Sequence, residues 1–146
     1  MLAPYGVLQS LTTSRDLTAA LKSVARVVPR GGAFGIDLVP EVGTWQEYRN
    51  ERRFHGRDGA ATFTLFESVR RNRRRRLTTF EERYVVRRGG EVREHRFDLV
   101  FRTVTLREMI RRLQQAGFAI DARFGDYRGG RWRAGADVWI LLAKKV

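Results

Sequence analysis

Residues 33–39 form an almost continuous apolar run, Ala-Phe-Gly-Ile-Asp-Leu-Val, which ends at Pro40. A run without polar alternation is typical of a strand that is buried on both faces, as in a parallel sheet. The preceding residues 15–28 carry apolar side chains at helical spacing, with Ser14 as the expected N-cap. Residues 31–32 are both glycine and connect this helix to the strand, as in α/β folds. This part of the chain therefore predicts a mixed α/β fold.

The middle of the chain changes to a pattern with period two. Residues 62–69 and 77–86 alternate between apolar and polar side chains, and residues 91–103 do so imperfectly. Gly89-Gly90 is a strong signal for a two-residue hairpin between the last two of these strands. The pattern predicts an antiparallel sheet of about three strands within residues 60–104, with one apolar face and one face rich in arginine.

A second helix is expected to begin after Thr105, because Thr105 and Glu108 have the spacing of a capping box. Strands are expected at residues 118–124 and 138–143, with a loop between them. Residues 43–53 are mixed and polar, and we interpret them as a short helix.

Length and composition favour a single domain, residues 1–146, with a real hydrophobic core. The chain has no cysteine, which excludes disulfides, thiolate metal sites and a cysteine nucleophile. Neither His55 nor His95 has a partner at metal-ligand spacing, so no metal site is expected. A packed or surface role is the simpler interpretation of His95, whereas His55, in a predicted polar loop, is a candidate base. No side chain stands out as a catalytic group.

No apolar run approaches the roughly 20 residues that a membrane-spanning helix needs. The first nine residues lack the basic start and the long apolar stretch of a signal peptide. The sequence therefore predicts a cytoplasmic protein that is not bound to a membrane.

The chain is strongly basic, with 29 Lys+Arg against 16 Asp+Glu and a formal net charge of +13. This balance favours acidic partners. All but three of the cations are arginines, a skew that coding bias also explains. The densest cluster, residues 70–76, either grips phosphates or protects strand ends from aggregation. It contains no interleaved aromatic residue, so nucleic-acid binding is kept only as an alternative.

Several segments, in this order, resemble the second half of class I S-adenosylmethionine-dependent methyltransferases. Ala-Pro-Tyr-Gly-Val-Leu-Gln at residues 3–9 resembles the end of the fourth strand of that family, and Phe-Gly-Ile-Asp-Leu-Val-Pro at 34–40 resembles the fifth. Residues 105–118 resemble the last helix, and Val-Trp-Ile-Leu-Leu-Ala-Lys-Lys at 138–145 resembles the seventh strand. The resemblance implies the last strands and helices of a Rossmann-like sheet, with an inserted antiparallel sheet that covers the substrate.

What this resemblance implies is the C-terminal portion of an enzyme that uses S-adenosyl-L-methionine as cofactor and methylates a small-molecule acceptor by in-line displacement. The main cofactor motif of the family lies upstream of the matched segments, and no Gly-x-Gly-x-Gly precedes a helix here. A missing N-terminal half or a homo-oligomer is then the expected partner. Without the earlier strands, the strand at residues 33–39 would also expose an apolar edge.

Ligands of α/β sheets lie beyond the carboxyl ends of the strands. On the cofactor side, the resemblance therefore implies Pro4, Tyr5 and Gln9. On the substrate side it implies Asp37, Trp45, Tyr48 and Tyr127. Packing is the competing interpretation for each of them. An Arg-rich nucleic-acid-binding module and an inactive interaction subunit remain the alternative functions.

Overall fold

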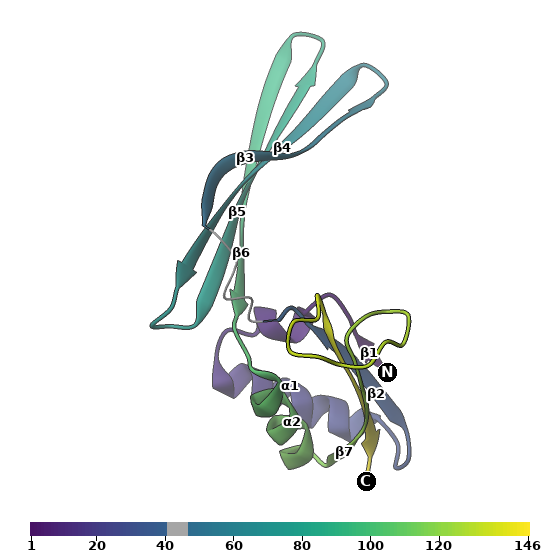
Figure 1. Cartoon of the computed structure of the whole chain (residues 1–146). Coiled ribbons are helices and arrows are strands. Elements are labelled where there is room, and N and C mark those ends of the chain that lie inside the picture. The colour runs from purple at the N-terminus through teal and green to yellow at the C-terminus, as the bar shows by residue number, and fades with distance from the viewer. Residues whose placement is uncertain (41–46) are drawn as a thin grey trace. The chain divides into compact units, whose positions relative to one another are not determined.

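The structure, a computed structural model, describes residues 1–40 and 47–146. The chain divides into two compact units (Figure 1). Unit 1 comprises Met1–Gly43 and Arg102–Val146, and unit 2 comprises Thr44–Phe101. The assignment of residues 1–146 to one domain stays a prediction, and each unit is described by itself.

Unit 1 contains a four-stranded sheet with the strand order β1-β2-β8-β7. β1 runs parallel to β2, whereas the other two neighbouring pairs are antiparallel. The strands are β1 (Leu2–Ala3), β2 (Ala33–Leu38), β7 (Phe118–Phe124) and β8 (Trp139–Lys145). The helices are the 3-10 helix η1 (Val7–Ser10) and the α-helices α1 (Ser14–Val27) and α2 (Leu106–Gln115).

β2 is one of the two inner strands of this sheet, and all of its residues except Ala33 are buried, as the apolar run predicts. Every residue of β2 pairs with β8, and β1 pairs with Gly35 and Ile36 of β2. The edge of β2 that was expected to be open is therefore covered in part, at Gly35 and Ile36. The first residues of the chain add a short parallel strand on the side that was expected to be open.

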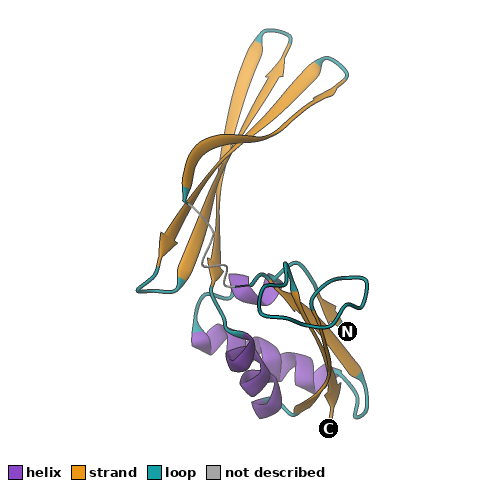
Figure 2. Ribbon diagram, in the orientation of Figure 1, coloured by secondary structure: helices purple, strands orange, loops and turns teal. Residues whose placement is uncertain are grey.

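Both α-helices of unit 1 pack against the same face of the sheet (Figure 2). Alternation along β2 places Phe34, Ile36 and Leu38 on this face. They form one core with residues of both helices and of β7 and β8, among them Leu17, Leu21, Met109, Leu113, Phe118 and Leu141. Gly35 and Asp37 point to the opposite face, so the one charged residue of β2 avoids the apolar core.

The two helix starts depend on threonine caps. α1 begins one residue earlier than expected, because Thr13 and not Ser14 is its N-cap, and the Thr13 hydroxyl oxygen accepts the Asp16 N–H at 3.1 Å. The predicted cap of α2 is confirmed, since the Thr105 hydroxyl oxygen accepts the Glu108 N–H at 3.1 Å. Each cap satisfies a backbone donor that the helix itself leaves unpaired.

Unit 2 is an antiparallel sheet of four strands in the order β3-β4-β5-β6. They are β3 (Tyr48–Asp58), β4 (Ala61–Asn72), β5 (Leu77–Arg88) and β6 (Glu91–Arg102). The interpretation of residues 43–53 as a short helix is wrong where it can be tested, because residues 48–53 belong to β3. Residues 43–46 lie outside the described part. Pairing with β4 decides the conformation of this charged segment, which carries only a weak local signal.

The two faces of the unit 2 sheet differ in chemistry. On one face Phe63 pairs with Val86 across the strands, and Leu65 pairs with Tyr84. On the other face Phe66 lies opposite Arg83, whose guanidinium carbon is 4.3 Å from the ring centroid. On this second face a cation, Arg83, lies over the aromatic ring of Phe66.

The hairpin between β5 and β6 is confirmed. Gly89 and Gly90 have φ values of 55° and 85°, and a two-residue turn of this kind needs positive φ at both positions. His55 lies on β3 and not in a loop, and its Nδ1 is 2.9 Å from the Thr64 hydroxyl oxygen. His95 lies on β6, the strand on which it was expected.

Candidate functional site

A buried carboxylate lies at the carboxyl end of β2, on the face of the sheet that turns away from the helices. Asp37 is 4% exposed. Its Oδ1 accepts the backbone N–H of Gly6 at 2.6 Å, and its Oδ2 accepts the hydroxyl of Tyr127. We call Asp37, Tyr5, Gly6 and Tyr127 the Asp37 cluster. It joins the turn after β1 to the loop between β7 and β8.

The turn after β1 has an unusual backbone. Tyr5 and Gly6 have φ values of 59° and 62°, so two consecutive residues are left-handed. A bulky residue such as tyrosine rarely adopts this conformation. A Cβ atom at Gly6 would lie 2.9 Å from Gln9 Oε1, so only glycine fits there without a shift. The turn leaves the Tyr5 side chain 86% exposed at this end of the sheet.

Tyr127 is presented by a loop that a second aspartate shapes. Asp126 Oδ1 accepts the backbone N–H groups of Arg128 and Gly130, both at 2.8 Å, and these bonds hold the pKa of Asp126 below its usual value. The hydroxyl of Tyr127 donates to Asp37. That bond, together with partial burial and the negative charge of Asp37, raises the pKa of Tyr127 to about 12. Tyr127 is therefore a neutral donor at physiological pH.

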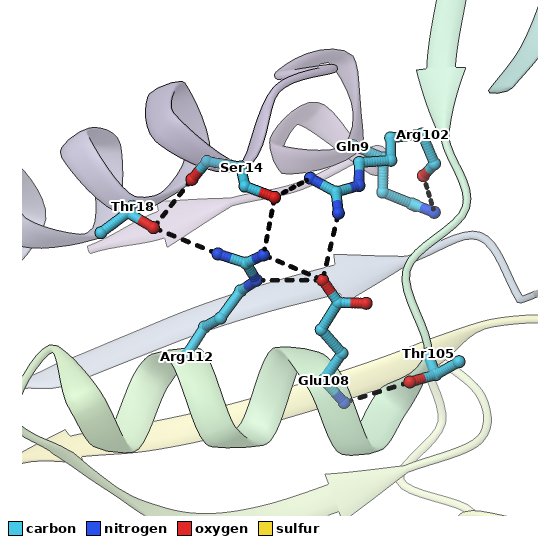
Figure 3. A network of polar contacts seen from close by, with 7 residues as sticks. All are labelled: Gln9, Ser14, Thr18, Arg102, Thr105, Glu108 and Arg112. Atoms are coloured by element: carbon cyan, nitrogen blue, oxygen red, sulfur yellow. Dashed lines mark hydrogen bonds and ion pairs between the residues drawn. The ribbon is translucent and has the colours of Figure 1, made fainter. Parts of the chain in front are cut away.

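The Gln9 side chain is fully occupied by the backbone of unit 1. It is 3% exposed, its Oε1 accepts the Val39 N–H at 2.8 Å, and its Nε2 donates to the Val39 carbonyl at 3.1 Å. The same nitrogen donates to the Arg102 carbonyl at 3.3 Å (Figure 3). Gln9 thus ties together the chain where it leaves β2 and where it returns after β6.

A nearby group of charged side chains links α1 to α2 (Figure 3). We call Glu108, Arg102 and Arg112, with the Ser14 hydroxyl, the Glu108 network. Glu108 Oε1 accepts from Arg102 at 3.4 Å and from Arg112 at 3.0 Å, and both arginines donate to Ser14, at 2.8 and 3.1 Å. The three charged side chains are 11–14% exposed, so this ion-pair network is largely shielded from water.

Unit 2 carries its own tyrosine–carboxylate contacts on its apolar face. The Tyr48 hydroxyl donates to Glu67, and burial together with this bond raises the pKa of Tyr48 to about 12. Glu67 lies directly opposite Glu82, which accepts the Tyr84 hydroxyl at 2.9 Å. Arg53 lies 3.3 Å from Glu67. Two carboxylates therefore face each other among aromatic side chains.

The structure thus brings three of the predicted residues together: Tyr5, Asp37 and Tyr127 lie in the Asp37 cluster. Pro4 precedes this turn, and its carbonyl accepts the Val7 N–H at 3.2 Å. Tyr48 belongs to unit 2, and Trp45 lies outside the described residues. The sequence interpretation did not identify Gly6, whose role depends on a left-handed turn that glycine adopts readily.

The pair Glu67 and Glu82 was also missed. The available signal was a carboxylate at a position where the alternating pattern calls for an apolar side chain. In residues 1–40 and 47–146, no three histidine, aspartate or glutamate side chains lie close enough to hold a metal ion. Nor does any helix in these ranges have the length and apolar character needed to cross a bilayer.

The basic cluster is divided between two strand ends and a turn. Residues 73–76 form the connection between β4 and β5, where Arg76 has a positive φ of 56°. At the end of β4, Arg70 forms an ion pair with Glu81 on β5. Part of this charge is therefore matched within the sheet.

No protein-family model and no curated protein matches this sequence. Solved structures show that its fold resembles S-adenosylmethionine-dependent methyltransferases. One such enzyme from Clostridium acetobutylicum ATCC 824 matches 99% of this chain with a TM-score of 0.78 at 15% identity, over 56% of its own length. The sugar N-methyltransferase KedS8 from Streptoalloteichus sp ATCC 53650 matches 99% with a TM-score of 0.77 at 15% identity, over 56% of its length.

A third similar structure is that of CalS10 from Micromonospora echinaspora, an amino pentose methyltransferase with bound S-adenosylmethionine. It matches 99% of this chain with a TM-score of 0.70 at 17% identity, over 58% of its length. The chain therefore spans little more than half of each of these proteins. At identities this low, the similarity shows the fold alone. The matched structures do not favour the two alternatives, a nucleic-acid-binding module and an inactive interaction subunit.

Proposed function

We propose that this chain is the C-terminal portion of an S-adenosylmethionine-dependent methyltransferase that acts on a small-molecule acceptor. The observation that carries the proposal is the likeness of the fold, over 99% of the chain, to enzymes of this activity. In this proposal the sheet of unit 1 is the last part of a Rossmann-like sheet. Unit 2 is the antiparallel insertion, and residues 1–146 form one domain that contains it.

The residues of unit 1 fit one wall of a cofactor site. β1 and β2 are parallel, and Pro4 and Tyr5 follow the carboxyl end of β1, where ligands of α/β sheets lie. The exposed Tyr5 ring offers a π-face that attracts cations. S-adenosylmethionine supplies a methyl group on a positively charged sulfonium, with a neutral leaving group. No Gly-x-Gly-x-Gly precedes a helix in these 146 residues, so we assign the other wall to an N-terminal half or to a second copy.

Within this site, Pro4 and Tyr5 line the cofactor side, and Gln9 supports them by holding the Val39 backbone. Asp37 and Tyr127 form the acceptor side. From the family resemblance alone, we also propose Tyr48 and Trp45 as acceptor-binding residues. Both Asp37 oxygens already accept hydrogen bonds, so Asp37 does not serve as a free general base. The contribution of these residues is to orient the acceptor for in-line attack.

An amine of sugar-like size suits this proposal as the acceptor class. Two of the similar enzymes are described as a sugar N-methyltransferase and an amino pentose methyltransferase. Only the neutral amine, which has lost any extra proton to solvent, can attack. Its lone pair forms the N–CH₃ bond as the C–S bond breaks and neutral S-adenosylhomocysteine leaves, and the methylated ammonium then releases a proton to solvent, so no buried base is needed.

The test is calorimetric titration of S-adenosylmethionine into the purified chain, followed by transfer of its labelled methyl group to a panel of amino sugars. One wall of the site should bind weakly, with a dissociation constant of about 1 mM, or about −4 kcal/mol. Tyr5→Ala should remove this binding, whereas Tyr84→Ala in unit 2 should preserve it. The absence of both binding and transfer at ten times that concentration would overturn the proposal.

A matched titration with duplex nucleic acid separates the basic-module alternative. That alternative requires binding that weakens steeply as salt increases and that disappears when Arg73, Arg74 and Arg75 are replaced by glutamine. The methyltransferase proposal expects no such binding.

A further inference from the structure

Asp37 occupies an unusual position for a buried carboxylate. It is 96% removed from solvent, yet the groups that satisfy it come from two loops that are far apart in the sequence. The Gly6 N–H reaches one oxygen from the turn after β1, and the Tyr127 hydroxyl reaches the other from the loop between β7 and β8. A buried carboxylate needs such donors, because burial without them is costly. Each loop is therefore held by a group that the fold cannot leave unpaired.

The turn after β1 depends on this contact. Its left-handed Tyr5 is a conformation that persists only where the surrounding structure enforces it. Two contacts do so at the next residue: the Gly6 N–H donates to Asp37, and Gln9 Oε1 closes the space above Gly6. The result is an exposed Tyr5 ring on a constrained backbone.

The loop between β7 and β8 reaches Asp37 from the other side. The turn around Asp126 places Tyr127 at the tip of the loop, and Phe124 and Arg131 form a bridge at its base. The Tyr127 side chain is 71% exposed, so packing contributes little to holding it. Its hydroxyl bond to Asp37 is the contact that connects the tip of the loop to the sheet.

We propose that Asp37 is a positioning residue, which fixes the Tyr5 turn and the Tyr127 loop against each other at the carboxyl end of the sheet. The Asp37 carboxylate then sets the positions of both the Tyr5 turn and the Tyr127 loop. A displacement of either segment shifts Asp37 and therefore displaces the other segment. The inference rests on the proposed function only for the ligand that these walls would hold. The contacts themselves are independent of any ligand.

The loop itself provides the first test, because Arg128, Arg131 and Arg133 are trypsin sites within it. Tyr127→Phe removes only the hydroxyl of an exposed side chain, so the variant should fold. We expect limited trypsin digestion to cut at these three positions about tenfold faster than in the wild type, which is the effect of a lost hydrogen bond to a charged group. The cut sites are identified by mass spectrometry.

Tyr48→Phe is the matched control, because it removes the same kind of tyrosine–carboxylate bond in unit 2. It should leave the cleavage rates at Arg128, Arg131 and Arg133 unchanged within about twofold. Equal cleavage of the wild type and Tyr127→Phe would overturn the proposal. So would equal acceleration in both variants, because that result would report general destabilisation.

The second test is spectroscopic and follows the phenol groups by NMR in chain labelled at the tyrosine ring carbons. Asp37→Asn keeps an oxygen for Gly6 but removes the negative charge. It should lower the pKa of Tyr127 from about 12 towards 10 and shift the Tyr5 signals, while Tyr48 and Tyr84 keep theirs. Unchanged Tyr5 and Tyr127 signals would overturn the inference. Neither test uses cofactor or acceptor, so their failure is distinct from failure of the proposed function.

Discussion

Three carboxylates of this arginine-rich chain accept tyrosine hydroxyls: Asp37 from Tyr127, Glu67 from Tyr48, and Glu82 from Tyr84. A phenol donates one hydrogen bond but carries no charge, so it does not neutralise the negative charge of the carboxylate. Burial and the hydrogen bond to Glu67 raise the pKa of Tyr48 to about 12, and the hydrogen bond to Asp37 together with partial burial raises the pKa of Tyr127 to about 12; the negative charge of each carboxylate adds to the shift. The stability of the fold must then depend on pH in the alkaline range.

The first prediction concerns this pH dependence. The pKa of Tyr48 is about 12 in the folded chain, whereas an unfolded tyrosine ionises near 10. The stabilisation is therefore complete below about pH 10 and is lost as the pH rises from about 10 to about 12. Melting curves should show that wild type exceeds Tyr48→Phe in melting temperature at pH 9, and that the difference shrinks by pH 11.5. Tyr5→Phe, which changes an exposed ring, serves as control and should show no such trend.

The second prediction concerns Gln9, whose side-chain amide forms two hydrogen bonds with the backbone of Val39 and one with the backbone carbonyl of Arg102. Gln9→Ala leaves buried backbone groups without partners, and at about 1 kcal/mol per lost bond it should lower the free energy of unfolding by about 3 kcal/mol. Gln114→Ala, on the exposed side of α2, should change it by less than about 0.5 kcal/mol. Urea denaturation measures both variants. Similar values for the two would show that Gln9 does not hold this junction.

At the scale of elements, the Glu108 network joins the first turns of α1 and α2. Glu108 lies at 13% exposure between two arginines, so its removal would leave two shielded cations facing each other. We predict that Glu108→Ala destabilises the chain by about 3 kcal/mol, the cost of breaking a buried ion pair. Glu91→Ala is the control, because Glu91 pairs with Arg93 at more than 70% exposure. Thermal unfolding in low and high salt should show that only the second pair is sensitive to salt.

The same elements show which parts of the fold the sequence determines locally. The helix at residues 15–28, the apolar strand at 33–39 and the Gly89-Gly90 hairpin each carry a complete local pattern, and the structure confirms them within one or two residues. β3 has no comparable pattern. Arg49, Glu51 and Arg53 give a helix and a strand equal support, and pairing with β4 decides between them.

The candidate site divides in the same way. Tyr5 and Asp37 follow from the positions of strand ends and Tyr127 from the last loop, and the structure brings them together. The role of Gly6 was not accessible, because its donor function depends on a left-handed turn that no periodicity describes. Glu67 interrupts the apolar alternation of β4, but its partners come from β3 and β5, and a single segment does not reveal the cross-strand register that pairs them.

At the scale of the whole molecule, Val39 directly follows β2 and Arg102 is the residue at which the chain returns to unit 1, and the backbone of both bonds to the same Gln9 amide. Val39 and Arg102, which flank unit 2 in the sequence, are therefore held close to each other within unit 1. Unit 1 also has its own apolar core, to which both α-helices and all strands except β1 contribute fully buried residues. A unit that has its own core, and in which the chain segments on either side of an insertion lie close together, has the properties of an independently folding domain.

We therefore predict that replacing residues 44–101 by about six glycine and serine residues leaves unit 1 folded, since short loops close at small entropic cost. Circular dichroism should retain the helical signal of α1 and α2, and calorimetry should show one cooperative transition. Leu113→Ala in the shortened chain is the control. It empties a fully buried position and should lower stability by about 3 kcal/mol, as a cavity in a packed core does. A shortened chain without cooperative melting would mean that unit 2 is required for the fold of unit 1.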